Sequence, residues 1–86
     1  MNTYQLTIAS PDGKLFSGLV QGIVLRGAEG DLAVLAGHMP FITSVKPCVC
    51  RITLEDGTER PAELGGGLLT VDKDSVTLLT ASFVWA

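Results

Sequence analysis

Apolar and polar residues alternate along most of this 86-residue chain, and the alternation predicts short β-strands. In the stretch TYQLTI, for example, Tyr4, Leu6 and Ile8 fall on one face, and the threonines and the glutamine fall on the other. A period of two residues is typical of a strand with one buried face. Because no segment combines about ten residues of 3.6-residue periodicity with helix caps, we expect an all-β protein.

Turn-forming residues separate these segments at short intervals. Pro11, Asp12 and Gly13 follow the first segment, where proline presets φ, aspartate bonds to the backbone and glycine accepts a positive φ. Evenly spaced short strands between such turns predict a two-sheet β-sandwich of about ten short strands. We expect residues 1–86 to form a single domain, since domains typically hold about 50 to 250 residues.

Glycines interrupt two of the predicted strands. The apolar run from Leu15 to Arg26 contains Gly18 and Gly22, and glycine inside a strand often marks a bulge or a close backbone approach. We therefore expect this run to bend and to take part in both sheets. The three consecutive glycines at 65–67 lead into a strand and not into a helix, so we interpret them as structural and not as a phosphate cradle.

The composition is that of a globular protein that does not bind nucleic acid. Hydrophobic residues make up 47% of the chain and charged residues 17%, which is far from a disordered profile. The net charge is −3, and the six basic residues are scattered, whereas phosphate binding requires clustered lysine and arginine. No apolar stretch approaches the roughly 18 to 20 residues of a membrane span, and the N-terminus lacks the features of a signal peptide. We expect a cytosolic or peripheral protein with no direct membrane span.

Few residues are candidates for catalysis, metal binding or nucleotide binding. Cys50 is in phase with Ile52 and Leu54, which places its thiol in the core, where it would be inert. A zinc site could draw on His38, Cys48 and Cys50, but structural zinc sites require four ligands at recognisable spacing. Neither a Walker-type nor a dinucleotide-type glycine loop occurs. We therefore expect no catalytic residue, no metal and no cofactor.

One stretch, GAEGDLAVLAGHMP at 27–40, brackets a brief strand with two turns. The first turn holds the acidic residues Glu29 and Asp31, and the second holds the only histidine, His38. We interpret four residues of the stretch as structural turn formers: Gly27, Gly30, Gly37 and Pro40. From the residues alone, the polar side chains either face water or form a docking surface.

Three long segments resemble a known family. SPDGKLFSGLV, GAEGDLAVLAGHMPFITSVKP and ELGGGLLTVDKDSVTLLTA are together similar to the N-terminal β-sandwich domain of the epsilon subunit of F-type ATP synthases, called delta in mitochondria. The similarity runs nearly end to end, and its central motif is long and gapless. Three positions depart from the pattern: Ala33 and Cys48 stand where glycine is usual, and Ala36 stands where proline is usual.

The resemblance implies a noncatalytic central-stalk subunit. In that family the sandwich, built of two five-stranded sheets, links the gamma subunit to the polar loops of the c-ring and couples ion translocation to ATP synthesis or hydrolysis. By motif match, Glu29, Asp31 and His38 are candidates for the loops that face the c-ring. The resemblance also implies a peripheral position on the cytoplasmic face of the cell membrane, as part of F1.

The chain ends at TASFVWA, before the C-terminal helical hairpin that family members usually carry. We therefore expect a sandwich without that hairpin, with neither its inhibitory activity nor nucleotide binding. Phe83, Val84 and Trp85 suggest a natural terminus that covers the surface the hairpin would shield. Alternatively, these residues mark a cut end or a partner contact.

Two other functions compete with the stalk hypothesis. The first is a stand-alone β-sandwich that binds a small ligand or a metal through the His38 loop. The second is a hydrolytic enzyme that uses Cys48 or Cys50 as its nucleophile.

Overall fold

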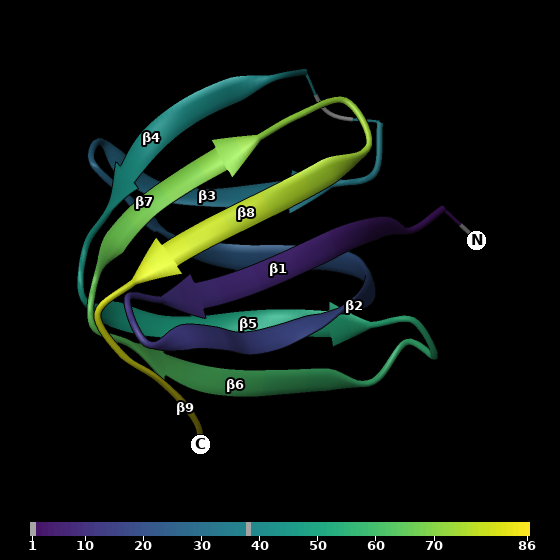
Figure 1. Ribbon diagram of the computed structural model, residues 1–86. Coiled ribbons are helices and arrows are strands. Elements are labelled where there is room, and N and C mark those ends of the chain that lie inside the picture. The colour runs from purple at the N-terminus through teal and green to yellow at the C-terminus, as the bar shows by residue number, and fades with distance from the viewer. Residues whose placement is uncertain (1, 38) are drawn as a thin grey trace.

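The computed structural model describes residues 2–37 and 39–86, which form nine strands and no helix (Figure 1). The predicted all-β sandwich is confirmed, with nine strands in the described residues where we expected about ten. In chain order the strands are β1 (Tyr4–Ser10), β2 (Gly13–Gly27), β3 (Gly30–Leu35), β4 (Phe41–Val45), β5 (Cys48–Leu54), β6 (Glu59–Leu64), β7 (Gly67–Val71), β8 (Ser75–Thr80) and β9 (Phe83–Trp85). Within these residues there is consequently no helix that could cross a bilayer.

The strands form two layers that face each other (Figure 1). The β8 layer has the strand order β2-β1-β8-β7-β4, to which β2 contributes its first half, and the β5 layer has β3-β2-β5-β6-β9, to which β2 contributes its second half. All neighbours pair antiparallel except β1 and β8, which run parallel although they come from opposite ends of the chain. A parallel pair requires a long connection, which the intervening strands supply.

Strand β2 joins the two layers, as the glycine-interrupted run predicted. Its first half pairs with β1, and its second half pairs with β3 on one side and β5 on the other. The register against β5 shifts between Val20 and Gly22, which is a β-bulge at the bend. A bulge bends a strand and increases its twist, which carries β2 from one layer to the other.

The core comes from both layers in the way the alternation predicted. Tyr4, Leu6 and Ile8 are buried from the β8 layer, and Cys50 and Ile52 are buried from the β5 layer. The Tyr4 hydroxyl donates a hydrogen bond of 2.7 Å to the carbonyl of Val34 on β3, and so connects the layers. Within the described residues, no buried side-chain nitrogen or oxygen lacks a hydrogen-bond partner.

The segment at 65–67 connects β6 to β7 where it packs closely against the backbone at the end of β8, which confirms its structural role. Gly66 and Gly67 have φ values of +89° and +155°. A Cβ atom on Gly67 would lie 1.8 Å from the carbonyl oxygen of Leu79. The Thr80 hydroxyl donates a hydrogen bond of 2.6 Å to the carbonyl of Gly66 at the same place.

The aromatic C-terminal segment packs on the β5 layer. Strand β9 pairs with β6, and the Trp85 ring lies 4.9 Å from the Phe83 ring and 5.7 Å from the Phe16 ring, both edge to face. The Arg60 guanidinium lies 4.1 Å from the centre of the Trp85 ring. Phe83 and Trp85 are half-buried as a result, while Val84 between them is exposed.

Candidate functional site

The predicted first turn is the tip of the β2–β3 hairpin, and it brings the acidic residues together. Ala28 and Glu29 form the turn, and Gly30 has a φ of +129°, which a side chain would strain. Gly27 pairs with Gly30 across the hairpin and takes no positive φ.

Asp31 lies opposite Arg26 on the same hairpin, and the two side chains form an ion pair with a nitrogen–oxygen distance of 3.0 Å. Both side chains are more than half exposed, so the pair contributes less than about 1 kcal/mol to stability. No ion pair is found for Glu29 within the described residues. The hairpin tip therefore presents one carboxylate shared with an arginine and a second carboxylate open to a partner.

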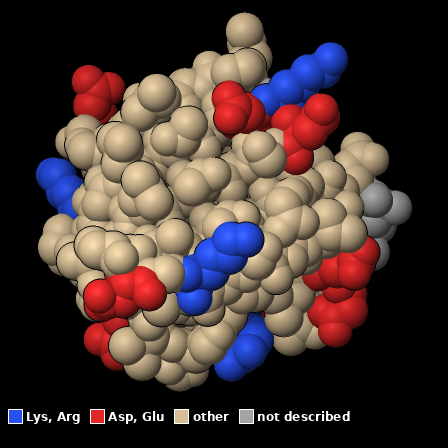
Figure 2. Space-filling model, in the orientation of Figure 1, with Lys and Arg blue, Asp and Glu red and all other residues tan. Residues whose placement is uncertain are grey.

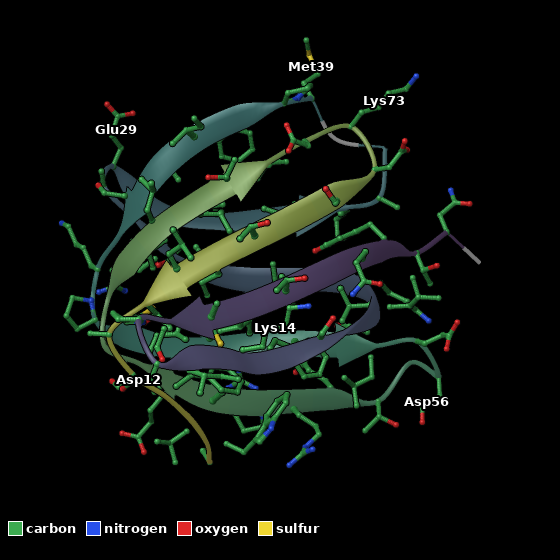
Figure 3. The ribbon with its side chains drawn as sticks, viewed as in Figure 1. Asp12, Lys14, Glu29, Met39, Asp56 and Lys73 are labelled. Atoms are coloured by element: carbon green, nitrogen blue, oxygen red, sulfur yellow. The ribbon has the colours of Figure 1, made fainter. Side chains whose placement is uncertain are left out.

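The predicted second turn lies at the other end of β3. His38 lies outside the described residues, and only the residues on either side of it are described. Gly37 has a φ of +84°, Met39 is 81% exposed, and Pro40 directly precedes β4. Figure 3 shows Glu29 and Met39 far apart, at opposite ends of β4. The structure thus unites Glu29 with Asp31 and separates both from the residues that flank His38.

The two thiols are poorly suited to chemistry. Cys50 is fully buried, and burial raises the pKa of its thiol to about 11, so it stays protonated at neutral pH. Cys48 is half-buried on the same strand, and neither cysteine is in a disulfide. Across residues 2–37 and 39–86, no three histidine, cysteine, aspartate or glutamate side chains gather to hold a metal ion.

Sequence reasoning missed the broadest feature of the surface, which is the outer face of the β8 layer. None of the charged residues of the chain lies on β1, β4, β7 or β8. The uncharged face, as we name it, consists of the outward side chains Gln5, Thr7, Ala9, Ile42, Ser44, Leu68, Thr70, Ser75, Thr77 and Leu79. The absence of charge from these four segments is visible in the sequence, but only the pairing shows that they form one surface.

Strand register aligns the uncharged face into rows. Thr7 lies beside Thr77, Thr77 beside Thr70, and Thr70 beside Ile42. A second row joins Leu79 to Leu68, with exposed fractions of 49% and 41%. Figure 2 shows the surface over β4, β7 and β8 without charge and charged side chains around it, with Lys14, labelled in Figure 3, at its lower margin beside β1.

An apolar depression of about 390 Å³ adjoins the end of the uncharged face. It is lined by residues of the β1–β2 turn and of the end of β8, among them Pro11, Leu79 and Ala81. A depression of this kind can receive one apolar side chain of a partner, which is a common form of interface hot spot.

Comparison with known proteins was made against family models and solved structures. A family model described as ATP synthase, Delta/Epsilon chain, beta-sandwich domain matches residues 3–86. A chain in the cryo-EM structure of the Euglena gracilis mitochondrial ATP synthase, OSCP/F1/c-ring, is similar with 25% identity and a TM-score of 0.90, covering 99% of this chain and 54% of that one. A chain in the central stalk/c-ring structure of the Tetrahymena thermophila mitochondrial ATP synthase has the same fold at 10% identity and a TM-score of 0.74, covering 93% of this chain and 64% of that one. This chain thus spans less than two thirds of each matched chain.

Proposed function

The chain belongs to the ATP synthase delta/epsilon family through its β-sandwich domain, and from this premise we propose that it is a noncatalytic subunit of the central stalk. In this role it links the gamma subunit to the c-ring and helps to couple ion translocation to ATP synthesis or hydrolysis. It acts at the cytoplasmic face of the cell membrane, as a peripheral part of F1. The observation that carries the proposal within the molecule is the uncharged face.

The gamma subunit covers the uncharged face in this proposal. Burying a charge in an interface without a matched partner is costly, whereas burying a leucine side chain is favourable and a threonine hydroxyl can be buried once it finds a hydrogen-bond partner. A large surface with no charge at its centre and a charged rim has the anatomy of a protein–protein interface. The leucine row and the adjoining depression supply its apolar centre.

The β2–β3 hairpin faces the c-ring in this proposal. Glu29 at the tip, beside the Arg26–Asp31 pair, can accept a charge-assisted hydrogen bond from a basic residue of the ring. Such an exposed contact adds little affinity but sets orientation and register, which a coupling contact needs. We assign this contact to the hairpin because its tip presents two carboxylates, while the residues that flank His38 lie about 20 Å away at the other end of β3.

A matched pair of variants tests the assignment to gamma. Leu79→Asp places a charge on the uncharged face, and Val49→Asp places the same charge on a somewhat more exposed outward position of β5 in the other layer. We expect Leu79→Asp to weaken binding of the cognate gamma subunit about 100-fold, or about 2.7 kcal/mol, because the new carboxylate would be buried. Val49→Asp should change the Kd by less than about threefold. Calorimetric titration measures both.

Two outcomes would contradict the proposal. If the unsubstituted chain and gamma separate on size exclusion at micromolar concentration, the stalk function itself fails. If both variants weaken the complex equally, or neither does, gamma does not cover the uncharged face. Circular dichroism of each variant shows whether its sandwich is folded before binding is measured.

A further inference from the structure

The two layers do not close on each other along one side of the sandwich. Strand β3 pairs only with β2, and β4 pairs with β7 along its whole length but with β2 only at Gly27–Val45. Within the described residues, the second edge of β3 and most of the second edge of β4 therefore have no neighbouring strand. An edge of this kind presents unpaired backbone donors and acceptors to another chain.

A groove of about 510 Å³ lies where these two edges meet, and we name it the edge groove. It is lined by residues 28–32 of the β2–β3 hairpin and by Phe41, Ile42 and Thr43 of β4. Phe41 faces the interior, since it pairs with buried Val71, yet it is 40% exposed. Leu32 packs on the core from the other wall and is only partly buried. The groove thus leaves core-directed apolar surface uncovered.

Nothing within β4 protects its edge from pairing. Natural edge strands are blocked by charged side chains, an internal proline, a bulge or very short length. The sequence of β4, FITSV, contains no charge and no proline, and its register against β7 is continuous over five residues. By contrast, the edge strand β3 carries Asp31, and the edge strand β9 has only three residues.

The charge of the groove selects its occupant. Glu29 and Asp31 are the only charged residues among its lining, and because Asp31 is paired with Arg26, the Glu29 carboxylate is the one open to a basic side chain. The groove is also continuous with the uncharged face, because Ile42 belongs to both. A partner that covers this face can extend a segment along β4 without crossing a charged rim.

We propose that the β4 edge is a strand-addition site that accepts an extended segment of the partner covering the uncharged face. The inference rests on the proposed function, which makes that partner the gamma subunit. The segment adds a strand to the β8 layer by backbone hydrogen bonding. Its apolar side chains, at alternate positions, cover Phe41 and Leu32, and a basic side chain lies opposite Glu29.

A threonine-to-lysine pair of variants tests the site. Thr43→Lys places a cation among the lining residues of the groove, on the inward side of β4, since Thr43 pairs with buried Leu69. The long side chain has to extend through the groove to reach solvent, which blocks the edge, and circular dichroism shows whether the sandwich stays folded. Thr53→Lys makes the same change at a half-buried, outward position of β5 in the other layer and shows the effect of an added lysine away from the groove. We expect Thr43→Lys to weaken gamma binding at least about tenfold and Thr53→Lys to leave it unchanged.

Hydrogen–deuterium exchange of the unsubstituted chain provides a readout that no variant can disturb. Binding of gamma should slow amide exchange over residues 41–44 at least about tenfold, because unpaired edge amides gain partners. Exchange over β5 should not change. The proposal is overturned if the complex forms with unchanged exchange over 41–44 and Thr43→Lys binds normally, since the interface is then the uncharged face alone.

Two further outcomes separate this inference from its premise. If the unsubstituted chain does not bind gamma at all, the proposed function fails and the strand-addition site loses its occupant with it. If residues 41–44 become protected in the chain alone as its concentration rises, the edge pairs with a second copy. That result overturns the assignment of the edge to a partner. The stalk function is then tested separately, by whether the chain binds gamma.

Discussion

The inner faces of the two layers are both apolar, whereas their outer faces differ in charge. Both contribute fully buried aliphatic side chains, such as Leu69 and Leu78 from the β8 layer and Ile23 and Ile52 from the β5 layer. The exterior of the β5 layer carries Arg51, paired with Glu59 at 3.3 Å, and further charges on β6. On the exterior of the β8 layer, β1, β4, β7 and β8 carry none, and Lys14 on the first half of β2 lies at the margin beside Ala9.

The contrast separates what folding requires from what interaction requires. Folding needs only the inner faces to be apolar, since burial of apolar area is the dominant favourable term. Outer faces are free to vary, and charge there favours solubility. Four adjacent strands with no charge on their outer face, but with threonine, serine and scattered leucine, stay hydrated in the free protein. A partner can bury such a face at a lower free-energy cost than a charged face.

The largest expected effect concerns the segment at 65–67, where the chain passes from the β5 layer to the β8 layer. Gly67→Ala should lower the free energy of unfolding by about 3 kcal/mol or more, because its Cβ would clash with the backbone of Leu79. Gly13→Ala, where φ is also positive but nothing lies within 4 Å of the added atom, should cost about 1 kcal/mol. Urea denaturation measures both. Equal losses would show that only φ strain, and not the close approach, matters at Gly67.

The second effect concerns the titratable groups buried in the two layers and how the free energy of unfolding changes at alkaline pH. Burial raises the pKa of the Cys50 thiol in the β5 layer from 9.0 to about 11, and burial also raises the pKa of the Tyr4 hydroxyl in the β8 layer. Between about pH 9 and 11 the unfolded state loses the Cys50 proton while the folded state keeps it. The free energy of unfolding should therefore fall by about 2 kcal/mol over this range.

Cys50→Ala supplies the control for the alkaline transition. This variant is less stable at neutral pH because it loses a buried group, but its stability should fall less steeply between about pH 9 and 11. The remaining slope belongs to Tyr4 and to any other group that titrates there. An identical slope in both proteins would show that the Cys50 thiol is not shielded in the folded state.

The third effect tests how Arg60, on the inward side of β6, holds the last strand through the Trp85 ring. Arg60→Met keeps the aliphatic stem but removes the cation over the Trp85 ring, so stability should fall by about 0.5 to 1 kcal/mol. Arg51→Met, which breaks only the exposed pair with Glu59, should cost less than about 0.5 kcal/mol. Tryptophan fluorescence during urea unfolding measures each. Indistinguishable variants would mean that the contact with the Trp85 ring adds nothing beyond an ordinary surface charge.

The smallest effect on stability belongs to the hairpin tip. Asp31→Asn should change the free energy of unfolding by less than about 0.5 kcal/mol, because the Arg26–Asp31 pair is exposed. Under the stalk proposal, the same variant should reduce ATP-driven ion pumping in the assembled enzyme. Unchanged pumping would remove Asp31 from the contact with the c-ring, and a large loss of stability would show that the ion pair is structural.

Local patterns in the sequence sufficed to identify the fold class and the family. Alternation selected Tyr4, Leu6, Ile8, Cys50 and Ile52 as inward residues, because the side-chain period of a strand depends only on its own backbone. The glycine positions likewise identified the bend in β2 and the crowded crossing at 65–67, and at the crossing a side chain on Gly67 would meet the backbone of Leu79. Long motifs were enough to indicate the family that the match over residues 3–86 confirms.

Only the tertiary structure decided which of these residues share a surface. Strand pairing joined β1 to β8 from opposite ends of the chain, and so merged four uncharged segments into one face. It also paired Asp31 with Arg26 and placed Glu29 far from the residues beside His38, although all lie within one short stretch. Pairing partners depend on contacts between residues remote in sequence, and a strand's own pattern says which face is buried but not which strand lies beside it.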